Sequence, residues 1–134
     1  MNAPELKPDI LDLMKEDPKN VSKIVLKVFF NIMRDWNVKN NDQRIILGEP
    51  SDSTFYNWKK NQAKALPRDT LERISYILGM YKSLGILFPT REQADAWVTK
   101  PNSAFNNESA LQVMLKGNML NLITVRNYLD AQRG

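Results

Sequence analysis

The first strong pattern of apolar positions along the chain lies between about Asn20 and Trp36. Its apolar residues recur at spacings of three and four, as they do on one face of an α-helix. They are Val21, Ile24, Val25, Val28, Phe29, Ile32, Met33 and Trp36, and the neighbouring Lys19, Lys23 and Lys27 fall off that face. We therefore predict a helix here that buries its whole apolar stripe in a core.

Further helical patterns follow, separated by Pro, Gly, Asn and Asp, and no segment alternates as a strand does. A short helix around Asp9–Lys15 is expected within an N-terminal arm of residues 1–18. The other predicted helices cover about Asn41–Leu47, Ser53–Asn61, Arg68–Phe88, Thr90–Val98, Ser109–Lys116 and Met119–Gln132, with a loop at Thr99–Asn107. The predicted fold class is all-α: a helical bundle with a helix-turn-helix lobe at 19–66, then a long linking helix and a small C-terminal helical lobe at 67–134.

Residues that favour helix ends mark the two short helices in the first lobe. Asn40 or Asn41 is expected to cap the first of them, and Gly48 to end it, since glycine tolerates the left-handed conformation found there. Ser51 or Asp52 is expected to cap the second. Two short helices joined by a glycine-containing turn have the form of a helix-turn-helix.

In a helix-turn-helix the second helix places its N-terminal side chains in the major groove of DNA. Phe55 and Trp58 are spaced to face inward, which leaves the polar residues of this helix outside. Those that can bond phosphates or base edges are Ser51, Ser53, Thr54, Tyr56, Asn57, Lys59 and Lys60. The alternative is a plain helical hairpin whose polar face is simply hydrated.

Charge is unevenly distributed along the chain. The net charge is −3 over residues 1–18, +5 over 19–66 and +2 over 67–134, within a total of +4. The helix-turn-helix region is therefore the most basic part, as contact with a phosphate backbone requires. Glu49 and Asp52 weigh against DNA binding, because carboxylates repel phosphates.

The composition excludes several kinds of chemistry. The chain has no cysteine and no histidine, so disulfides, Cys or His zinc sites and Ser-His-Asp triads are impossible. No Gly-rich phosphate loop is present, and the pair Glu92 and Asp95 is typical of a solvated helix start. We therefore expect no enzyme, no catalytic residue, no metal and no cofactor. Without a long apolar run or a signal-peptide pattern, we expect a cytoplasmic protein that does not associate with membranes.

The second half of the chain carries a recognisable succession of short motifs. In order they are Leu71–Leu84, Leu87-Phe88-Pro89, Ala96-Trp97-Val98, Lys100-Pro101-Asn102, Ala104-Phe105, Ala110–Leu115 and Val125–Leu129. Together they resemble the Xre/MbcA/ParS antitoxin family over about residues 34–134. The resemblance implies a helical type II antitoxin with an Xre-like helix-turn-helix. Its C-terminal domain would bind a RES- or ParT-like toxin that uses NAD, and would block the toxin's NAD pocket.

The resemblance also assigns toxin-binding residues. It gives a docking loop of Trp97, Pro101, Asn102 and Phe105, supported by Leu111 and Leu115, and places Val125, Tyr128, Leu129, Arg133 and Gly134 at or near the mouth of the toxin's active site. Aromatic anchors in an ordered loop are frequent hot spots of protein interfaces. The alternatives are that Trp97 and Phe105 fill the core and that Arg133 is a frayed end.

Two positions depart from the family pattern. Asn106 or Asn107 stands where the family has glycine after the Phe loop, and Ala110 stands where it has proline. Asparagine tolerates the left-handed conformation best after glycine, so we expect the loop to keep its shape. Alanine loses only the preorganisation that proline gives to the first helical turn.

The function predicted is therefore a type II antitoxin that neutralises a cognate toxin and represses its own operon. The expected partners are that toxin, operator DNA and a second copy of the chain in a homodimer. An alternative of a different class is a stand-alone helix-turn-helix transcriptional regulator whose C-terminal half only dimerises.

Overall fold

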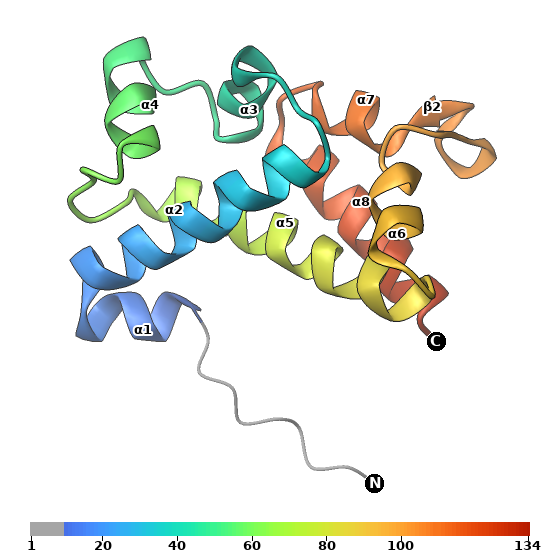
Figure 1. The fold of residues 1–134 in the computed structure, drawn as a ribbon, viewed down its shortest axis with the longest axis horizontal. Coiled ribbons are helices and arrows are strands. Elements are labelled where there is room, and N and C mark those ends of the chain that lie inside the picture. Colours follow the sequence, from blue (N-terminus) through green and yellow to red (C-terminus); the bar gives the residue numbers. More distant parts are fainter. Residues whose placement is uncertain (1–9) are drawn as a thin grey trace, which may run out of the picture.

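The computed structural model describes residues 10–134, and the regular elements of this part are helices apart from one pair of two-residue strands (Figure 1). The helices are α1 Ile10–Glu16, α2 Pro18–Asp35, α3 Asn40–Ile46, α4 Asp52–Lys59, α5 Arg68–Leu87, α6 Arg91–Trp97, α7 Ala110–Met114 and α8 Met119–Gln132. The all-α prediction is confirmed. The first nine residues of the predicted N-terminal arm lie outside the described residues.

Helix α5 is the common element of the two lobes. It packs against α2 of the first lobe and against α6 and α8 of the second (Figure 1). Its inward residues are almost fully buried: Leu71, Ile74, Ile77, Met80 and Leu84. Its predicted start after Pro67 and its predicted stop before Pro89 are both close to the observed ends. The core is therefore continuous from the first lobe to the second.

Helix α2 buries a different edge of its apolar stripe than the spacing predicts. Leu26, Phe29 and Met33 are fully buried, whereas Ile24 is 55% exposed and Val28 is 40% exposed. The prediction that Ile24 and Val28 belong to the core is wrong. The stripe is wider than the seam that α5 covers, so the helix presents one edge of it to the core and leaves the other edge open.

The short helices of the first lobe begin and end close to the predicted positions. Lys39, not Asn40 or Asn41, is the N-cap residue of α3, and it makes no side-chain capping bond. The capping bond of α4 comes from Ser51, whose hydroxyl accepts from the amide of Thr54 at 3.3 Å. Gly48 takes the left-handed conformation that the sequence predicts for it, with φ of +93°.

The predicted loop Thr99–Asn107 contains more structure than expected. Strand β1 (Pro101–Asn102) pairs antiparallel with β2 (Glu108–Ser109), and the 3-10 turn Ser103–Phe105 lies between them. Asn106 and Asn107 close this hairpin with φ of 55° and 67°, both left-handed. Both asparagines therefore take the left-handed conformation that the sequence predicts they tolerate.

Helix α7 starts at Ala110, where the resemblance implies a proline. Ala110 occupies the first helical position, directly after the N-cap Ser109. The Ser109 hydroxyl accepts from the Gln112 amide, and the Gln112 side chain accepts from the Ser109 amide, at 3.1 and 2.8 Å. This reciprocal capping box fixes the helix start without the preorganisation of a proline.

Candidate functional site

The turn between α3 and α4 is held by one arginine. Arg44 on α3 donates from Nε to the carbonyl oxygen of Pro50 at 2.7 Å, and its Nη1 lies 3.1 Å from the carboxylate of Asp52. The first contact fixes the turn, and the second pairs a carboxylate that would otherwise repel a phosphate. Arg44 is not among the residues predicted from the sequence, because no local pattern indicates that a helix residue reaches across the following turn.

The start of α4 carries a cluster of hydroxyl groups. Ser51 Oγ donates to Thr54 Oγ1 at 2.9 Å and lies 3.3 Å from Ser53 Oγ. Ser51 and Ser53 are exposed, and Thr54 is half-buried. Predicted DNA-binding hydroxyls thus gather at one helix N-terminus, where the backbone dipole also favours an anion.

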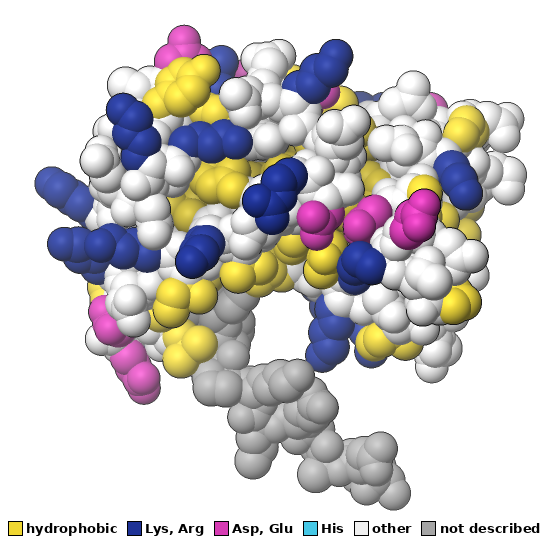
Figure 2. All heavy atoms as spheres, in the orientation of Figure 1, with side chains coloured by type: hydrophobic (Ala, Val, Ile, Leu, Met, Phe, Trp, Pro, Cys, Tyr) yellow, Lys and Arg dark blue, Asp and Glu magenta, His cyan; other side chains and the backbone are white. Residues whose placement is uncertain are grey.

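The rest of the predicted DNA-facing set follows the outer side of α4. Tyr56, Asn57 and Lys60 are exposed, while Phe55 and Trp58 are buried as predicted. On the face shown in Figure 2, Lys and Arg side chains gather over α2 and α4. The second helix therefore presents a polar and basic surface to solvent.

Lys59 is placed differently from its neighbour Lys60. Its ammonium lies 4.6 Å from the centre of the Phe30 ring and 5.7 Å from that of Phe55. Burial against these rings lowers the pKa of Lys59 from its ordinary value of 10.5. The Lys59 ammonium is therefore partly engaged in contacts with the aromatic rings of its own lobe. Lys60 is exposed and is the more available of the two lysines for phosphate contact.

In the second lobe, three aromatic residues from three elements meet. The rings of Trp97 and Tyr128 are stacked, with centroids 6.1 Å apart and planes 13° apart. Phe105 packs edge-on against both, at 6.3 Å from Trp97 and 5.1 Å from Tyr128. Helix α6, the hairpin and helix α8 are thereby joined at one point, which we call the aromatic cluster.

A cavity of about 190 Å³ opens beside the aromatic cluster. Its lining is mostly apolar and consists of Leu87, Phe88, Trp97, Tyr128, Leu129 and Gln132. Trp97 and Tyr128 are half-buried, so both offer ring surface to this opening, whereas Phe105 is 7% exposed and Leu129 is 1% exposed. Phe105 and Leu129 therefore support the surface from within.

The hairpin presents the other predicted docking residues. Pro101 is exposed and Asn102 is half-buried. Asn102 shapes the tip, because its Oδ1 accepts from the amide of Ala104 at 2.9 Å and its carbonyl accepts from the amide of Asn107 at 3.0 Å. Pro101 and Asn102 thus belong to the hairpin whose Phe105 packs against Trp97.

The C-terminal end of α8 is held against α5. Arg133 donates from Nη1 to the hydroxyl of Ser83 at 3.2 Å, and Ser83 donates in turn to Asp130 at 3.4 Å. The Gly134 amide continues the helical pattern by donating to the carbonyl of Ala131 at 3.3 Å. The frayed-end alternative for Arg133 is therefore wrong: the hydrogen bond to Ser83 orders this side chain.

Both halves of the chain match known domains. Residues 17–79 match the family model of the antitoxin Xre-like helix-turn-helix domain, and residues 83–134 match that of the antitoxin Xre/MbcA/ParS C-terminal toxin-binding domain. The chain belongs to the Xre/MbcA/ParS antitoxin family. This antitoxin is also 48% identical over 109 residues to the uncharacterized protein y4oB of Sinorhizobium fredii. The aligned residues cover 81% of the antitoxin and 84% of y4oB.

The two matched domains make this chain a type II antitoxin, and neither domain belongs to an enzymatic family. The helix-turn-helix match ends within α5 and the toxin-binding match begins within it. The predicted boundaries after residues 18 and 66 stay predictions. Between residues 10 and 134, no helix is long and apolar enough to cross a membrane.

Proposed function

We propose that this antitoxin neutralises a RES- or ParT-like, NAD-using toxin by covering the toxin's active site with its C-terminal region. The observation that carries the proposal is the aromatic cluster, where Trp97 and Tyr128 present stacked rings beside an open cavity. Gln132, two residues before the chain end at Gly134, lines the same cavity. A partner that inserts an apolar side chain there would also meet the last turn of α8.

The physics of interfaces supports this assignment. Aromatic side chains that lie in a well-packed setting and keep part of their surface open carry much of the binding energy in protein complexes. Phe105 fixes both open rings from behind, so little conformational freedom is lost when a partner binds. Trp97, Pro101, Asn102 and Tyr128 would contact the toxin, and Phe105 and Leu129 would hold them in place.

The ordered end of α8 is the second surface that we propose to contact the toxin. Arg133 is already aligned by Ser83, and a cavity of about 390 Å³ is lined by Arg126, Asp130, Arg133 and Gly134. Guanidinium groups recognise carboxylates and phosphates through paired hydrogen bonds. The Arg133 guanidinium would therefore face anionic groups in or near the NAD pocket of the toxin, with Gly134 beside it.

The test is neutralisation of the cognate toxin. Cells that express the toxin should recover growth and NAD content with the full chain, and a variant ending at Gln132 should rescue neither. Operator binding by the shortened variant serves as the control for folding. If the shortened variant still rescues the cells, or if the full chain does not co-purify with the toxin, the proposal is wrong.

We further propose that the antitoxin represses its own operon through α4, as a homodimer. The hydroxyl cluster, Asn57 and Lys60 support DNA contact, and the pairing of Asp52 with Arg44 lowers the repulsion that Asp52 would exert. Helix-turn-helix proteins commonly bind two half-sites as dimers. Light scattering should therefore give twice the chain mass, and a promoter fragment should be bound with two-fold symmetric protection.

A further inference from the structure

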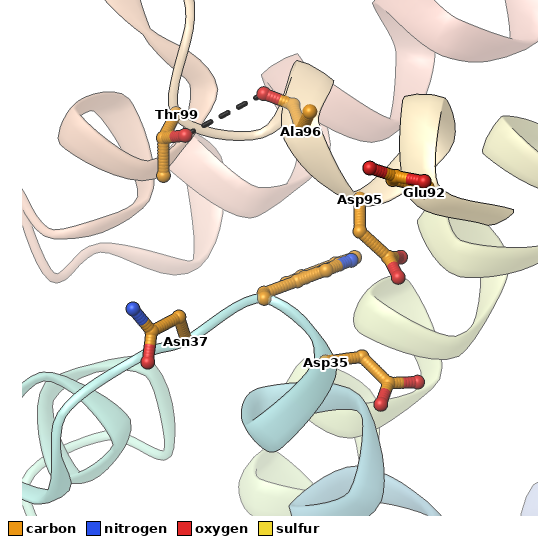
Figure 3. A pocket seen from close by; sticks show the side chains of 7 residues that line it. Asp35, Asn37, Glu92, Asp95, Ala96 and Thr99 are labelled. Atoms are coloured by element: carbon orange, nitrogen blue, oxygen red, sulfur yellow. Dashed lines mark hydrogen bonds between the residues drawn. The ribbon is translucent and has the colours of Figure 1, made fainter.

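An acidic cleft lies where α2 ends and α6 begins, outside the two surfaces described so far. Its volume is about 360 Å³, and its lining consists of Asp35, Trp36, Asn37, Glu92, Asp95, Ala96 and Thr99 (Figure 3). Figure 2 shows acidic side chains gathered on this part of the molecular face. The pair Glu92 and Asp95, predicted from the sequence to be a solvated helix start, thus belongs to a concave surface.

The cleft is acidic on a chain whose net charge is positive. Among the described residues, its lining includes the carboxylates of Asp35, Glu92 and Asp95, and no lysine or arginine. Arg91 contacts one of these groups from outside the lining, donating from Nε to Asp95 at 3.1 Å while its guanidinium lies 3.6 Å from the Tyr81 ring centre. Two carboxylates remain without a cationic partner among residues 10–134, which favours a cationic occupant.

A second, independent feature also indicates an occupant. Trp36 is 2% exposed and lines the cleft, and its Nε1 is buried without a hydrogen-bond partner in the described part of the chain. An indole N–H can only donate, so it requires an acceptor oxygen. Buried polar groups are nearly always paired, and an exception needs an explanation. An occupant that carries a carbonyl oxygen beside a positive charge would satisfy both the indole and the carboxylates.

We propose that this cleft binds an arginine residue of the toxin, a proposal that rests on the function proposed above. The planar guanidinium can bond carboxylates on α2 and on α6 at once, which the compact ammonium of lysine does less well. A backbone carbonyl next to that arginine supplies the acceptor for Trp36 Nε1. Thr99 links the cleft to the docking hairpin, so one partner can reach both surfaces.

The cleft can be tested without the toxin, using N-acetyl-arginine amide as a probe of the full chain. The indole N–H signal of Trp36, identified by its loss in Trp36→Phe, should shift saturably in ¹⁵N-labelled protein. The signals of Trp58 and Trp97 should stay in place, and the neutral N-acetyl-glutamine amide should shift none of them. Glu92→Gln should weaken probe binding at least threefold. No saturable shift, or an equal shift with the neutral probe, would mean that water fills the cleft and would overturn the proposal.

The same residues can be tested in the complex. The double variant Asp35→Asn with Glu92→Gln should bind the toxin at least tenfold more weakly, whereas Glu16→Gln, an exposed carboxylate on α1, should bind as the parent does. Asp35 accepts a hydrogen bond from Tyr81 at 2.9 Å, so the thermal midpoint of the double variant is measured as well. If that variant is unfolded, Glu92→Gln alone decides, since Glu92 is exposed.

The two proposals fail in different ways. If the parent chain binds the toxin and the cleft variants bind it equally well, the arginine site is wrong and the proposed function stands. If the parent chain does not bind the toxin at all, the proposed function is wrong, whatever the probe experiment shows.

Discussion

Arg73 Nη1, on α5, lies 3.1 Å from the carbonyl oxygen of Gly117, 44 residues further along the chain. The same nitrogen lies 3.4 Å from the carbonyl oxygen of Ile46 at the end of α3. Arg73 is 9% exposed, and its Nε is paired with Asp69 at 3.0 Å. One buried guanidinium therefore joins the helix-turn-helix to the turn before α8, and so joins the two lobes.

Replacing Arg73 should destabilise the protein strongly. Arg73→Ala leaves the carbonyl groups of Ile46 and Gly117 without this donor, and we expect the free energy of unfolding to fall by about 2–4 kcal/mol. Arg68→Ala is the matched control, because it breaks an exposed ion pair with Glu72 on the same helix and should cost less than about 1 kcal/mol. Urea unfolding measures both, and equal losses would contradict the assigned role of Arg73.

The stability of the protein should depend on the residue at position 106, at the tip of the hairpin. Asn106 has φ of 55°, and an ordinary L-residue pays about 1–2 kcal/mol in this conformation. Asn106→Ala should therefore lower the free energy of unfolding by about that amount, and Asn106→Gly should change it by less than about 0.5 kcal/mol. An Ala variant as stable as the parent would show that the left-handed tip is not required.

Tyr81 should make the protein lose stability at alkaline pH. Burial and the hydrogen bond to Asp35 raise the pKa of Tyr81 above its ordinary value of 10.0. Its contribution is complete below pH 10, where both states hold the proton, and declines as pH rises because the unfolded chain ionises first. Urea unfolding between pH 8 and pH 11 should show a smaller decline for Tyr81→Phe than for the parent. An equal decline in both would exclude this role.

Toxin affinity should depend far more on Tyr128 than on the adjacent residue Asn127. Tyr128→Ala removes one of the two stacked rings, and we expect toxin binding to weaken by at least tenfold, or about 1.4 kcal/mol. Asn127→Ala, an exposed position on the same helix, should bind within about twofold of the parent. Titration calorimetry with the purified toxin measures both, and indistinguishable affinities would contradict the proposed interface.

DNA affinity should respond to Lys60 in a salt-dependent way. Lys60→Gln removes one cation from the outer face of α4, so binding should weaken. The negative slope of log K against log salt should become shallower by about 1. Lys100→Gln, in the other lobe, should leave that slope unchanged. Fluorescence anisotropy with a promoter fragment at several salt concentrations provides the slope, and an unaltered slope for Lys60→Gln would remove it from the DNA-facing set.

Local patterns predicted most of the helices, because each depends on apolar spacing and on residues at its ends. They also predicted that Asn106 and Asn107 could take the place of glycine, since that preference belongs to the residue itself. They did not predict which edge of α2 meets α5, which is why Ile24 and Val28 were wrongly assigned to the core. Periodicity gives the width of an apolar stripe but does not say how much of it a neighbour covers.

The candidate sites also combine features that local sequence sets with features that depend on packing between elements. The outer face of α4 could be predicted from the position of Phe55 and Trp58 alone, because one helix sets both faces. The contact of Arg44 with Pro50 depends on how the turn after α3 folds back, and the position of Trp36 in the acidic cleft depends on how α2 and α6 meet. A single sequence contains no local signal for such meetings.

The continuity of α5 has a consequence for regulation. Because this one helix belongs to both lobes, the surface proposed for DNA and the surface proposed for the toxin are fixed at one distance and one angle. A toxin molecule held by an operator-bound dimer would then sit at a position dictated by the spacing of the half-sites. Whether two such toxins clash or fit side by side would decide if the toxin strengthens repression or relieves it.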